Sequence, residues 1–373
     1  MKISKLNLVC FRNYSNLNIL LGDNMNIFVG DNAQGKTNIL EGITILALTK
    51  SHRIGVNPNI IMFEKNKCKI LGVIKKDKVV SKLEVFITND NKLLKINGSN
   101  IKKVADYISY LNIIVFTPDD LEIIKGSPNI RRNLMNIQLS QLSSVYLNSY
   151  NEYNKLLKTR NEYLRVLFNN SIADINYLDI ITDKLIEKAI IIYQKRKEYI
   201  DSINHMINYY YKEITSESGL FIKYVPNILF KDYEYETIRK ALKHTYKKNY
   251  LKELNYGMTI YGPHRDDIYF ELNDKDLKFY GSQGQQRLAI LSFKLSEIPI
   301  FNQICNTNPV LLLDDIFSEL DIKKRNKLLK IINSNDIQSI ITTTDLKNIN
   351  KKYLENASVF RVKNGIIERE GRD

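Results

Sequence analysis

A glycine-rich segment near the start of the chain has the residue types and spacing of a phosphate-binding loop. Residues 30–37 satisfy the pattern GxxxxGK(S/T) at every fixed position, and they are Gly30, Asp31, Asn32, Ala33, Gln34, Gly35, Lys36 and Thr37. The context also fits, with an apolar strand predicted before the segment and a helix after it. Glycines let successive backbone N–H groups point at phosphate oxygens, and the helix N-terminus adds partial positive charge. We therefore expect bound ATP, with Lys36 on the β- and γ-phosphates and Thr37 as a ligand of Mg²⁺.

Two adjacent acidic residues follow the apolar run 310–313. A strand that delivers a carboxylate at its C-terminal end provides a second anchor for Mg²⁺, and Asp314 is in that position. Asp315 is the candidate general base that would orient and polarise an attacking water.

A third candidate is the segment 281–287, which a predicted helix follows. It resembles the LSGGQ signature of ABC-type ATPases, with Ser282, Gly284 and Gln285 in matching places and Gln283 between them. A hydroxyl, backbone amides next to glycine and a helix N-terminus form another phosphate cradle. In the ABC arrangement this cradle closes over the γ-phosphate held by the opposite subunit. A helix cap or a polar turn remains the alternative reading of the same residues.

The resemblance to ABC ATPases implies further roles. The segment 318–321 lies where these proteins keep their D-loop, and Thr343 and Thr344 lie where many carry a switch histidine. Transporter ATPases usually place Glu where this chain has Asp315, so we expect slow turnover. No glutamine can be assigned to a Q-loop.

Blocks along nearly the whole chain resemble the RecF family, whose members have heads like those of Rad50 and SMC proteins without the long coiled coil. The matching blocks are LVCFRNY (8–14), GKTNILE (35–41), TPDDL (117–121), KGSPNIRR (125–132), GPHRDD (262–267) and SQGQQR (282–287). One departure is Asn136, where the family commonly carries Asp, so a charge pair expected there is in doubt. From about 140 to 255 the resemblance is thin.

The family resemblance implies a weak, DNA-stimulated ATPase of recombinational gap repair, replication restart and the SOS response. ATP binding would drive homodimerisation on duplex DNA near single-strand gaps, and hydrolysis would release it. RecO and RecR would be partners in loading RecA. Two other functions stay open: an ATPase subunit of a membrane transporter, which the long helical insertion disfavours, and an ATP-gated scaffold that does not hydrolyse.

Four basic side chains near these blocks remain ambiguous. Arg12 could contact nucleotide or lie on the surface. His264, beside Arg265, is more readily a structural hydrogen-bonding residue than a catalytic one. The pair Arg131 and Arg132 could contact DNA phosphates or form salt bridges within its own lobe.

The pattern of apolar residues predicts an α/β protein with an inserted, mainly helical lobe, and the resemblance implies that the α/β part is a P-loop ABC-type ATPase head. Residues 1–115 and 256–373 would form the discontinuous ATPase lobe, and 116–255 the helical one. Predicted strands are 3–9, 26–29, several within 68–98 with turns at 88–91 and 97–98, then 258–260, 268–272, 309–313 and 339–344. Predicted helices are 36–48, 139–167, 178–214 and 236–255, the middle two packed as an antiparallel hairpin with its tyrosines in the core.

Composition limits the partners. The chain has 373 residues and a formal net charge of +14, from 55 Lys+Arg against 41 Asp+Glu, which favours a polyanion such as DNA. Contacts mainly to phosphates are expected, because no base-reading motif is present. Three scattered cysteines indicate neither a disulfide framework nor a zinc ribbon. With no secretory leader and no long apolar run, we expect a cytoplasmic protein without a membrane partner.

Overall fold

The computed structural model describes residues 1–51, 60–169, 174–334, 336–347 and 349–370. The chain forms two compact units. The first contains residues 1–120, 209–217 and 290–373, and the second contains 121–208 and 218–289. These boundaries differ from the expected lobes, mainly because residues 256–289 pack with the helical segments rather than with the nucleotide-binding end of the chain.

A mainly parallel sheet is the centre of the first unit. Its strand order is β15-β14-β3-β13-β12-β8, with only the terminal β14–β15 pair antiparallel. The strands are β3 (Met25–Val29), β8 (Ile113–Phe116), β12 (Val310–Asp314), β13 (Ser339–Thr343), β14 (Ala357–Lys363) and β15 (Ile366–Arg369). All residues of β3, β12 and β13 are buried, which explains their continuous apolar character. The strands predicted at 26–29, 309–313 and 339–344 are confirmed within one residue at either end.

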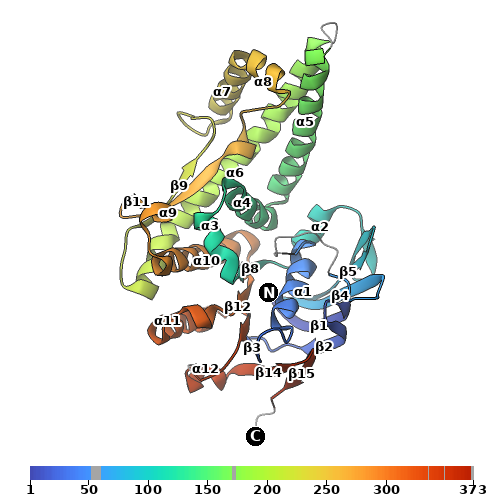
Figure 1. The fold of residues 1–373 in the computed structure, drawn as a ribbon, viewed down its shortest axis with the longest axis vertical. Coiled ribbons are helices and arrows are strands. Elements are labelled where there is room, and N and C mark those ends of the chain that lie inside the picture. Colours follow the sequence, from blue (N-terminus) through green and yellow to red (C-terminus); the bar gives the residue numbers. More distant parts are fainter. Residues whose placement is uncertain (52–59, 170–173, 335, 348, 371–373) are drawn as a thin grey trace. The chain divides into compact units, whose positions relative to one another are not determined.

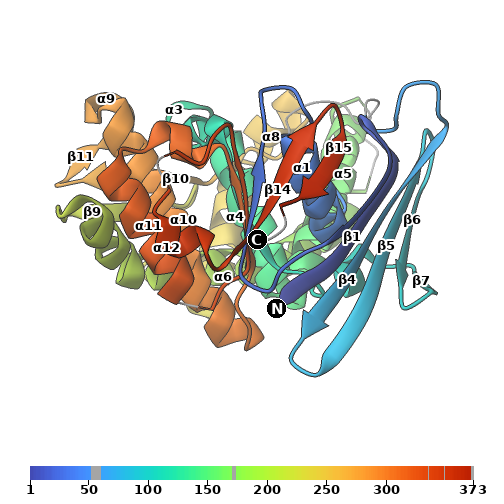
Figure 2. The same cartoon turned by 90° about the horizontal axis from the view of Figure 1, so that it is seen from below.

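An antiparallel sheet of order β2-β1-β4-β5-β6-β7 forms the other half of this unit (Figure 2). Its strands are β1 (Lys2–Phe11), β2 (Tyr14–Leu20), β4 (Lys67–Lys76), β5 (Val79–Thr88), β6 (Lys92–Ile96) and β7 (Ser99–Ile101). Buried and less buried residues alternate along much of β4, as the period-two pattern of 68–98 predicted, whereas β2 was not predicted. Both predicted turns are confirmed: the N–H of Thr88 donates to the carbonyl of Asn91, and Asn97 and Gly98 have φ of 50° and 85°.

Helix α1 (Lys36–Leu48) packs between the two sheets and has the predicted bounds. Its side chains join those of both sheets in one apolar core that includes Leu8, Ile39, Ile43 and Leu312. The unit also contains α2 (Val104–Ile108), η2 (Pro118–Leu121), η4 (Ile316–Glu319), α11 (Ile322–Ser334) and α12 (Lys351–Leu354). The helix therefore fixes its own N-terminus at the end of β3, where the glycine-rich loop lies.

The second unit is mainly helical (Figure 1). Its helices are α3 (Glu122–Lys125), α4 (Pro128–Leu142), α5 (Ser144–Asn169), α6 (Ile175–Thr215, of which the last turns belong to the first unit), α7 (Tyr235–Lys248), α8 (Tyr250–Tyr256), η3 (Pro263–Arg265) and α9 (Leu277–Tyr280). A small antiparallel sheet has the order β11-β10-β9, with β9 at Leu220–Val225, β10 at Asp267–Leu272 and β11 at Lys275–Asp276.

The antiparallel packing of α5 and α6 is confirmed. Arg160 Nε donates to Thr182 Oγ1 at 2.9 Å, and Lys188 Nζ lies 2.6 Å from a carboxylate oxygen of Glu152, so the two helices run in opposite directions. Tyrosines of the stripe are core residues, with Tyr153 1% exposed.

Three predictions in this unit need correction. The helix expected at 139–167 begins only at Ser144, because residues 139–142 form the end of α4. The helix expected at 236–255 is interrupted at Asn249, between α7 and α8. The strand expected at 258–260 is wrong, because the backbone N–H groups of Thr259 and Ile260 donate to the side chains of Asn161 and Glu253 instead of to a strand. A strand needs its backbone groups for a ladder, and side chains have taken them here.

Helix α10 (Gln283–Cys305) is the one helix of the described residues that is long and apolar enough to cross a membrane. Most of its apolar window is buried inside the structure, as in a core helix. The three cysteines are free thiols, as expected.

Candidate nucleotide site

The glycine-rich loop runs from the end of β3 to the start of α1. Gly35 has φ of 106° and Ala33 has φ of 64°. A Cβ atom on Gly30 would lie 2.2 Å from the carbonyl oxygen of Val362, and one on Gly35 would lie 2.5 Å from Asn13 Nδ2. Both glycines are therefore required by backbone conformation or by close packing. Gly35 has no side chain to cap α1, so backbone donors at this helix end remain for a ligand.

The Lys36 side chain is held inside the loop. Its exposed fraction is 7%, and Nζ donates to the carbonyl oxygens of Gly30 at 2.5 Å and Asp31 at 2.7 Å. Burial lowers the pKa of Lys36 from its ordinary value, while the carboxylates of Asp315 and Asp314 act in the opposite direction. The ammonium group is therefore desolvated and placed among acceptors, ready to exchange carbonyl oxygens for stronger anionic ones.

Asp314 joins the loop to the acidic end of β12. Thr37 Oγ1 donates to Asp314 Oδ1 at 2.9 Å, and Thr342 Oγ1 donates to the same oxygen at 2.7 Å. The parallel register places Asp314 directly opposite Thr342. Thr37 and Asp314 thus present two hard oxygens side by side, the donor type that Mg²⁺ prefers.

Thr342 was missed by the sequence reasoning, which considered Thr343 and Thr344. Thr343 Oγ1 instead donates to the carbonyl oxygen of Asp345 at 3.0 Å. Thr342 also accepts the backbone N–H of Asp315 at 3.0 Å, so it fixes both acidic residues. Only the register between β12 and β13 distinguishes the three threonines, and this register cannot be predicted from the sequence.

Asp315 occupies a strained position at the edge of the same cavity. Its φ is 47°, in the left-handed region. Among the described residues, no donor reaches its buried Oδ1. The cavity measures about 320 Å³, and its lining comes from the glycine-rich loop, η2 and both strand ends: Asn32, Ala33, Gly35, Lys36, Thr37, Asn38, Pro118, Asp314, Asp315 and Thr342. An unpartnered carboxylate oxygen in a cavity suits a residue that orients a water or a hydrated cation.

The η2 turn that brings Pro118 to the cavity has its own support. Asp120 accepts the backbone N–H of Thr117 at 2.8 Å, and Lys294 Nζ pairs with Asp120 and donates to the carbonyl oxygen of Val115. Lys294 is 2% exposed. A buried lysine on α10 therefore fixes the turn beside the nucleotide cavity.

Arg12 is paired rather than free. Its guanidinium donates to both carboxylate oxygens of Glu41, at 2.9 Å and 2.7 Å, and Glu41 is fully buried on α1. Asn13 and Tyr14, the next residues, donate to the carbonyl oxygens of Gln34 (3.4 Å) and Gly35 (3.1 Å). The β1–β2 connection thus braces both α1 and the glycine-rich loop.

The signature-like segment lies in the second unit, at the N-terminus of α10. Ser282 Oγ accepts the N–H of Gln285 at 3.2 Å, and Gln285 Oε1 accepts the N–H of Ser282 at 3.0 Å. This reciprocal pair is a capping box at the start of α10. Ser282, Gln283 and Gly284 are exposed. A Cβ atom on Gly284 would meet nothing closer than Ser282 Oγ at 3.9 Å, so the packing of this chain does not require glycine there.

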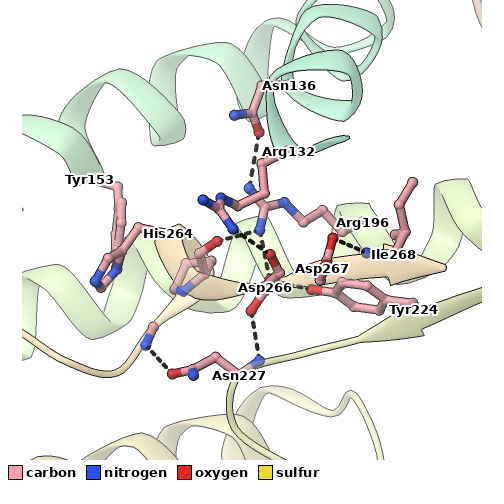
Figure 3. A network of polar contacts seen from close by, with 12 residues as sticks. Arg132, Asn136, Tyr153, Arg196, Tyr224, Asn227, His264, Asp266, Asp267 and Ile268 are labelled. Atoms are coloured by element: carbon pink, nitrogen blue, oxygen red, sulfur yellow. Dashed lines mark hydrogen bonds and ion pairs between the residues drawn. The ribbon is translucent and has the colours of Figure 1, made fainter. Parts of the chain in front are cut away.

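A buried polar network surrounds the GPHRDD block (262–267) of the second unit (Figure 3). Asp266 is fully buried and accepts from Arg196 Nη1 at 2.6 Å, from Tyr224 Oη at 2.6 Å and from the N–H of Asn227 at 2.9 Å. Arg196, in the middle of α6, also donates to the carbonyl oxygen of Pro263 at 2.6 Å. Sequence reasoning missed Arg196, because no motif marks a charged residue on an otherwise amphipathic helix.

The same network gives Arg131, Arg132 and Asn136 partners within the second unit. Arg131 pairs in bidentate fashion with Asp267, at 2.7 Å and 2.8 Å, and Arg132 donates to the carbonyl oxygen of Asp266 at 2.9 Å. These contacts lie within the second unit. Asn136 Oδ1 accepts from Arg196 Nη2 at 3.0 Å. At this position, where the family commonly carries Asp, the chain therefore forms a hydrogen bond and not a second ion pair.

His264 is structural. Its Nδ1 lies 2.6 Å from Tyr153 Oη, and its Nε2 lies 3.2 Å from the carbonyl oxygen of Thr259. Burial lowers the pKa of His264 to about 4. The ring is therefore neutral near pH 7 and acts as a hydrogen-bonding strut.

The described residues contain no group of three or more His, Cys, Asp or Glu side chains that would hold a metal by themselves. A cation at the Thr37–Asp314 pair would therefore need further oxygens from a phosphate ligand and water, as Mg²⁺ sites with nucleotides generally do.

A phosphate-binding loop, an acidic strand end on a parallel sheet and an antiparallel sheet packed across α1 define an ATPase head of the ABC type. The family model of the RecF/RecN/SMC N terminal domain matches residues 2–368. The chain belongs to the RecF family.

Relatives of this family match over their full length. The DNA replication and repair protein RecF of Halalkalibacterium halodurans is 37% identical over 373 residues, which is 100% of both chains. The RecF protein of Staphylococcus aureus strain Newman is also 37% identical, over 98% of this chain and 100% of its own. A solved structure of the recombination mediator protein RecF with ATP, of the RecFOR pathway, has 30% identity and a TM-score of 0.90, with 99% of this chain and 98% of that chain covered. An SMC head domain of Pyrococcus furiosus shares the fold, with 15% identity and a TM-score of 0.53.

Proposed function

We propose that this protein binds ATP and DNA in recombinational gap repair and replication restart, in the cytoplasm, as a RecF of the RecFOR pathway. The relatives carry the name of a DNA replication and repair protein, and one solved relative holds ATP. The single observation that carries the proposal is the cavity in which the glycine-rich loop meets Asp314, Asp315 and Thr342.

ATP would lie on the loop 30–37, with backbone N–H groups and Lys36 facing its β- and γ-phosphates. Lys36 would leave the carbonyl oxygens of Gly30 and Asp31 for phosphate oxygens, a move that needs only rotation of a flexible side chain. Thr37 and Asp314 would hold Mg²⁺. When bound, Mg²⁺ neutralises charge on the phosphate oxygens.

Asp315 is the proposed residue that orients the attacking water. Its Oδ1 is buried at the cavity without a donor among the described residues, which leaves it available to accept a proton from water. Aspartate is one methylene shorter than the glutamate that transporter ATPases usually have here, so we propose that hydrolysis is slow. We also propose that DNA stimulates it.

ATP-driven homodimerisation would bring Ser282, Gln283, Gly284 and Gln285 of one subunit over the γ-phosphate held by the other. Gly284 supports this assignment. Packing within its own chain does not require glycine at this position, and the absence of a side chain leaves room for the nucleotide of a second subunit. The N-terminus of α10 adds donors and partial positive charge.

DNA would be gripped mainly through phosphates, in line with the net charge of +14. We propose gapped duplex as the substrate, RecO and RecR as partners, and assistance in loading RecA as the outcome. Hydrolysis would release the dimer from DNA.

Solution dimerisation tests this proposal. Light scattering or sedimentation would follow the parent, Lys36→Met and Ser282→Arg with and without ATP, and with and without gapped duplex DNA. We expect ATP to dimerise only the parent, and gapped DNA to strengthen that dimer. A parent that stays monomeric with both ligands would contradict the composite site.

A scaffold that binds ATP without hydrolysing it is the second candidate, and the short side chain of Asp315 favours it. Single-turnover hydrolysis with gapped DNA separates the two. A parent rate no faster than that of Asp315→Asn would favour the scaffold.

A further inference from the structure

The second unit contains a cavity of about 520 Å³ that the nucleotide chemistry does not use. It lies between α6 and the α7–α8 segment, and we call it the α6–α7 cavity. Its apolar lining includes Leu178 and Ile186 from α6 and Tyr246 from α7, all buried, with Ile175 and Tyr250 at less buried positions.

The polar floor of the cavity is already satisfied. Arg160 is 1% exposed and donates to Glu253 at 2.7 Å and to Thr259 Oγ1 at 2.7 Å. Tyr246 covers the guanidinium at 4.7 Å from the ring centroid. A ligand would thus meet an apolar interior and need not neutralise a buried charge.

The cavity opens where a ladder of ion pairs between α6 and α7 is incomplete. Glu187 pairs with Arg239 at 3.6 Å, and Asp183 pairs with Lys243 at 2.9 Å. Four residues further along each helix, in opposite directions, are Asp179 and Lys247. Both line the cavity, and within the described part of the chain no ion pair joins them.

Lys243 and Lys247 line the cavity, and α7 and α8 carry further exposed lysines and apolar side chains. Four exposed lysines of α7 and α8 form what we call the lysine ridge, and the ion pairs of the described residues include none of them: Lys240, Lys247, Lys248 and Lys252. Leu251, beside the cavity-lining Tyr250, is 71% exposed, and Ile175 is 48% exposed. Asp179 is the one rim carboxylate described here without an ion pair.

This combination favours a protein partner. DNA phosphates would pair with lysines but would gain nothing from an apolar cavity or from exposed Leu251 and Ile175. A peptide uses both, because an apolar side chain seated in a pocket supplies binding energy and rim charges supply selectivity.

We propose that the α6–α7 cavity and the lysine ridge form a docking site for an acidic peptide segment of a partner protein. One aromatic or branched aliphatic side chain of that segment enters the cavity. Its carboxylates pair with Lys247, Lys248 and Lys252, and the site is independent of the nucleotide.

Fluorescence offers a specific test, because the chain contains no tryptophan. Tyr250→Trp in the full-length protein places the only indole at the cavity. The probe is a synthetic peptide of alternating aspartate and glutamate with a central phenylalanine. Two matched peptides replace either phenylalanine by alanine or every carboxylate by its amide.

We expect the probe to change the emission of Tyr250→Trp, and each matched peptide to bind about tenfold or more weakly. Reversal of charge at Lys247 and Lys248 should weaken the probe about tenfold, since each exposed ion pair is worth little alone. Lys155→Glu with Lys231→Glu, two exposed lysines of the same unit outside the ridge, is the control and should bind as the parent does. Thermal unfolding midpoints check that every variant folds.

Three outcomes would overturn the proposal. They are no emission change at about millimolar probe, equal binding of the amide peptide, and probe binding that reversal of Lys247 and Lys248 leaves unchanged. Displacement of the probe by a short DNA duplex, with Leu251→Ser having no effect on either ligand, would assign the ridge to nucleic acid instead.

Discussion

Gly284→Ala separates the role of the signature-like segment in assembly from its role in the fold. Gly284 lies in the first turn of α10, and a Cβ atom there meets only Ser282 Oγ, at 3.9 Å. Alanine should therefore fit the monomer without strain. Because glycine in a helix costs roughly 0.5–1 kcal/mol relative to alanine, the variant should be more stable than the parent, with an unfolding midpoint higher by about 1–3 °C.

The same methyl group should damage dimerisation. In the proposed composite site, the backbone at Gly284 approaches the γ-phosphate of the other subunit, and a Cβ atom would occupy that space. We expect at least a tenfold loss in ATP-dependent dimerisation by sedimentation. Binding of labelled ATP to the monomer should be unchanged, because Gly284 does not line the cavity of the glycine-rich loop.

Gln283→Ala, a change at a neighbouring exposed position that adds no Cβ atom, is the matched control for stability. The reasoning would be refuted if Gly284→Ala dimerised with ATP as the parent does. A Gly284→Ala monomer less stable than the parent would refute the prediction of increased stability, since the structure leaves room for the methyl group.

Three further predictions concern buried ionisable side chains. Arg196→Met should lower the free energy of unfolding by about 3–5 kcal/mol in urea titrations, because Asp266 is fully buried and loses its cation. Lys294→Met should cost less, about 2–3 kcal/mol, since Asp120 is partly exposed, and Asp120→Asn in the same chain should restore part of the loss. His264 has a pKa of about 4 when folded and an ordinary value near 6.5, so the unfolded chain binds more protons between these values. Stability should fall as pH is lowered through that window, by up to about 3 kcal/mol, and urea titrations of His264→Asn should lack this component.

Local patterns predicted the parts of the site that lie within one stretch of chain. The loop 30–37 and helix 36–48 follow from one strand, turn and helix, and the acidic end of β12 follows separately from an apolar run that ends in two aspartates. The role of Thr342 could not be predicted in this way. Three consecutive threonines have equal chemistry, and only pairing with β12 selects the one that reaches Asp314.

Long-range pairing also explains the errors in the helical region. The segment 258–260 has strand-like composition. Its backbone N–H groups instead donate to the side chain of Asn161, which is distant in sequence, and to that of Glu253, on the preceding helix α8. Arg196 and Asp266 are 70 residues apart, and neither periodicity nor charge pattern links them. The unit boundary moved for the same reason, because β10 pairs with β9 of the helical region.

The order of strands in the parallel sheet has a consequence for how the protein is made. β3, which leads into the glycine-rich loop, pairs with β13 and β14. Val29 therefore has no neighbour in the sheet until residues such as Thr343 have been synthesised. During synthesis the antiparallel sheet and the helical segments can form from neighbouring sequence, whereas β3 has neither neighbour until residues 339–363 have been translated. A chain released before residue 357 would lack β14 and expose one edge of β3, and such an unpaired apolar edge favours aggregation. We therefore expect the nucleotide site to form late, because a chain without β13 and β14 lacks both sheet neighbours of β3.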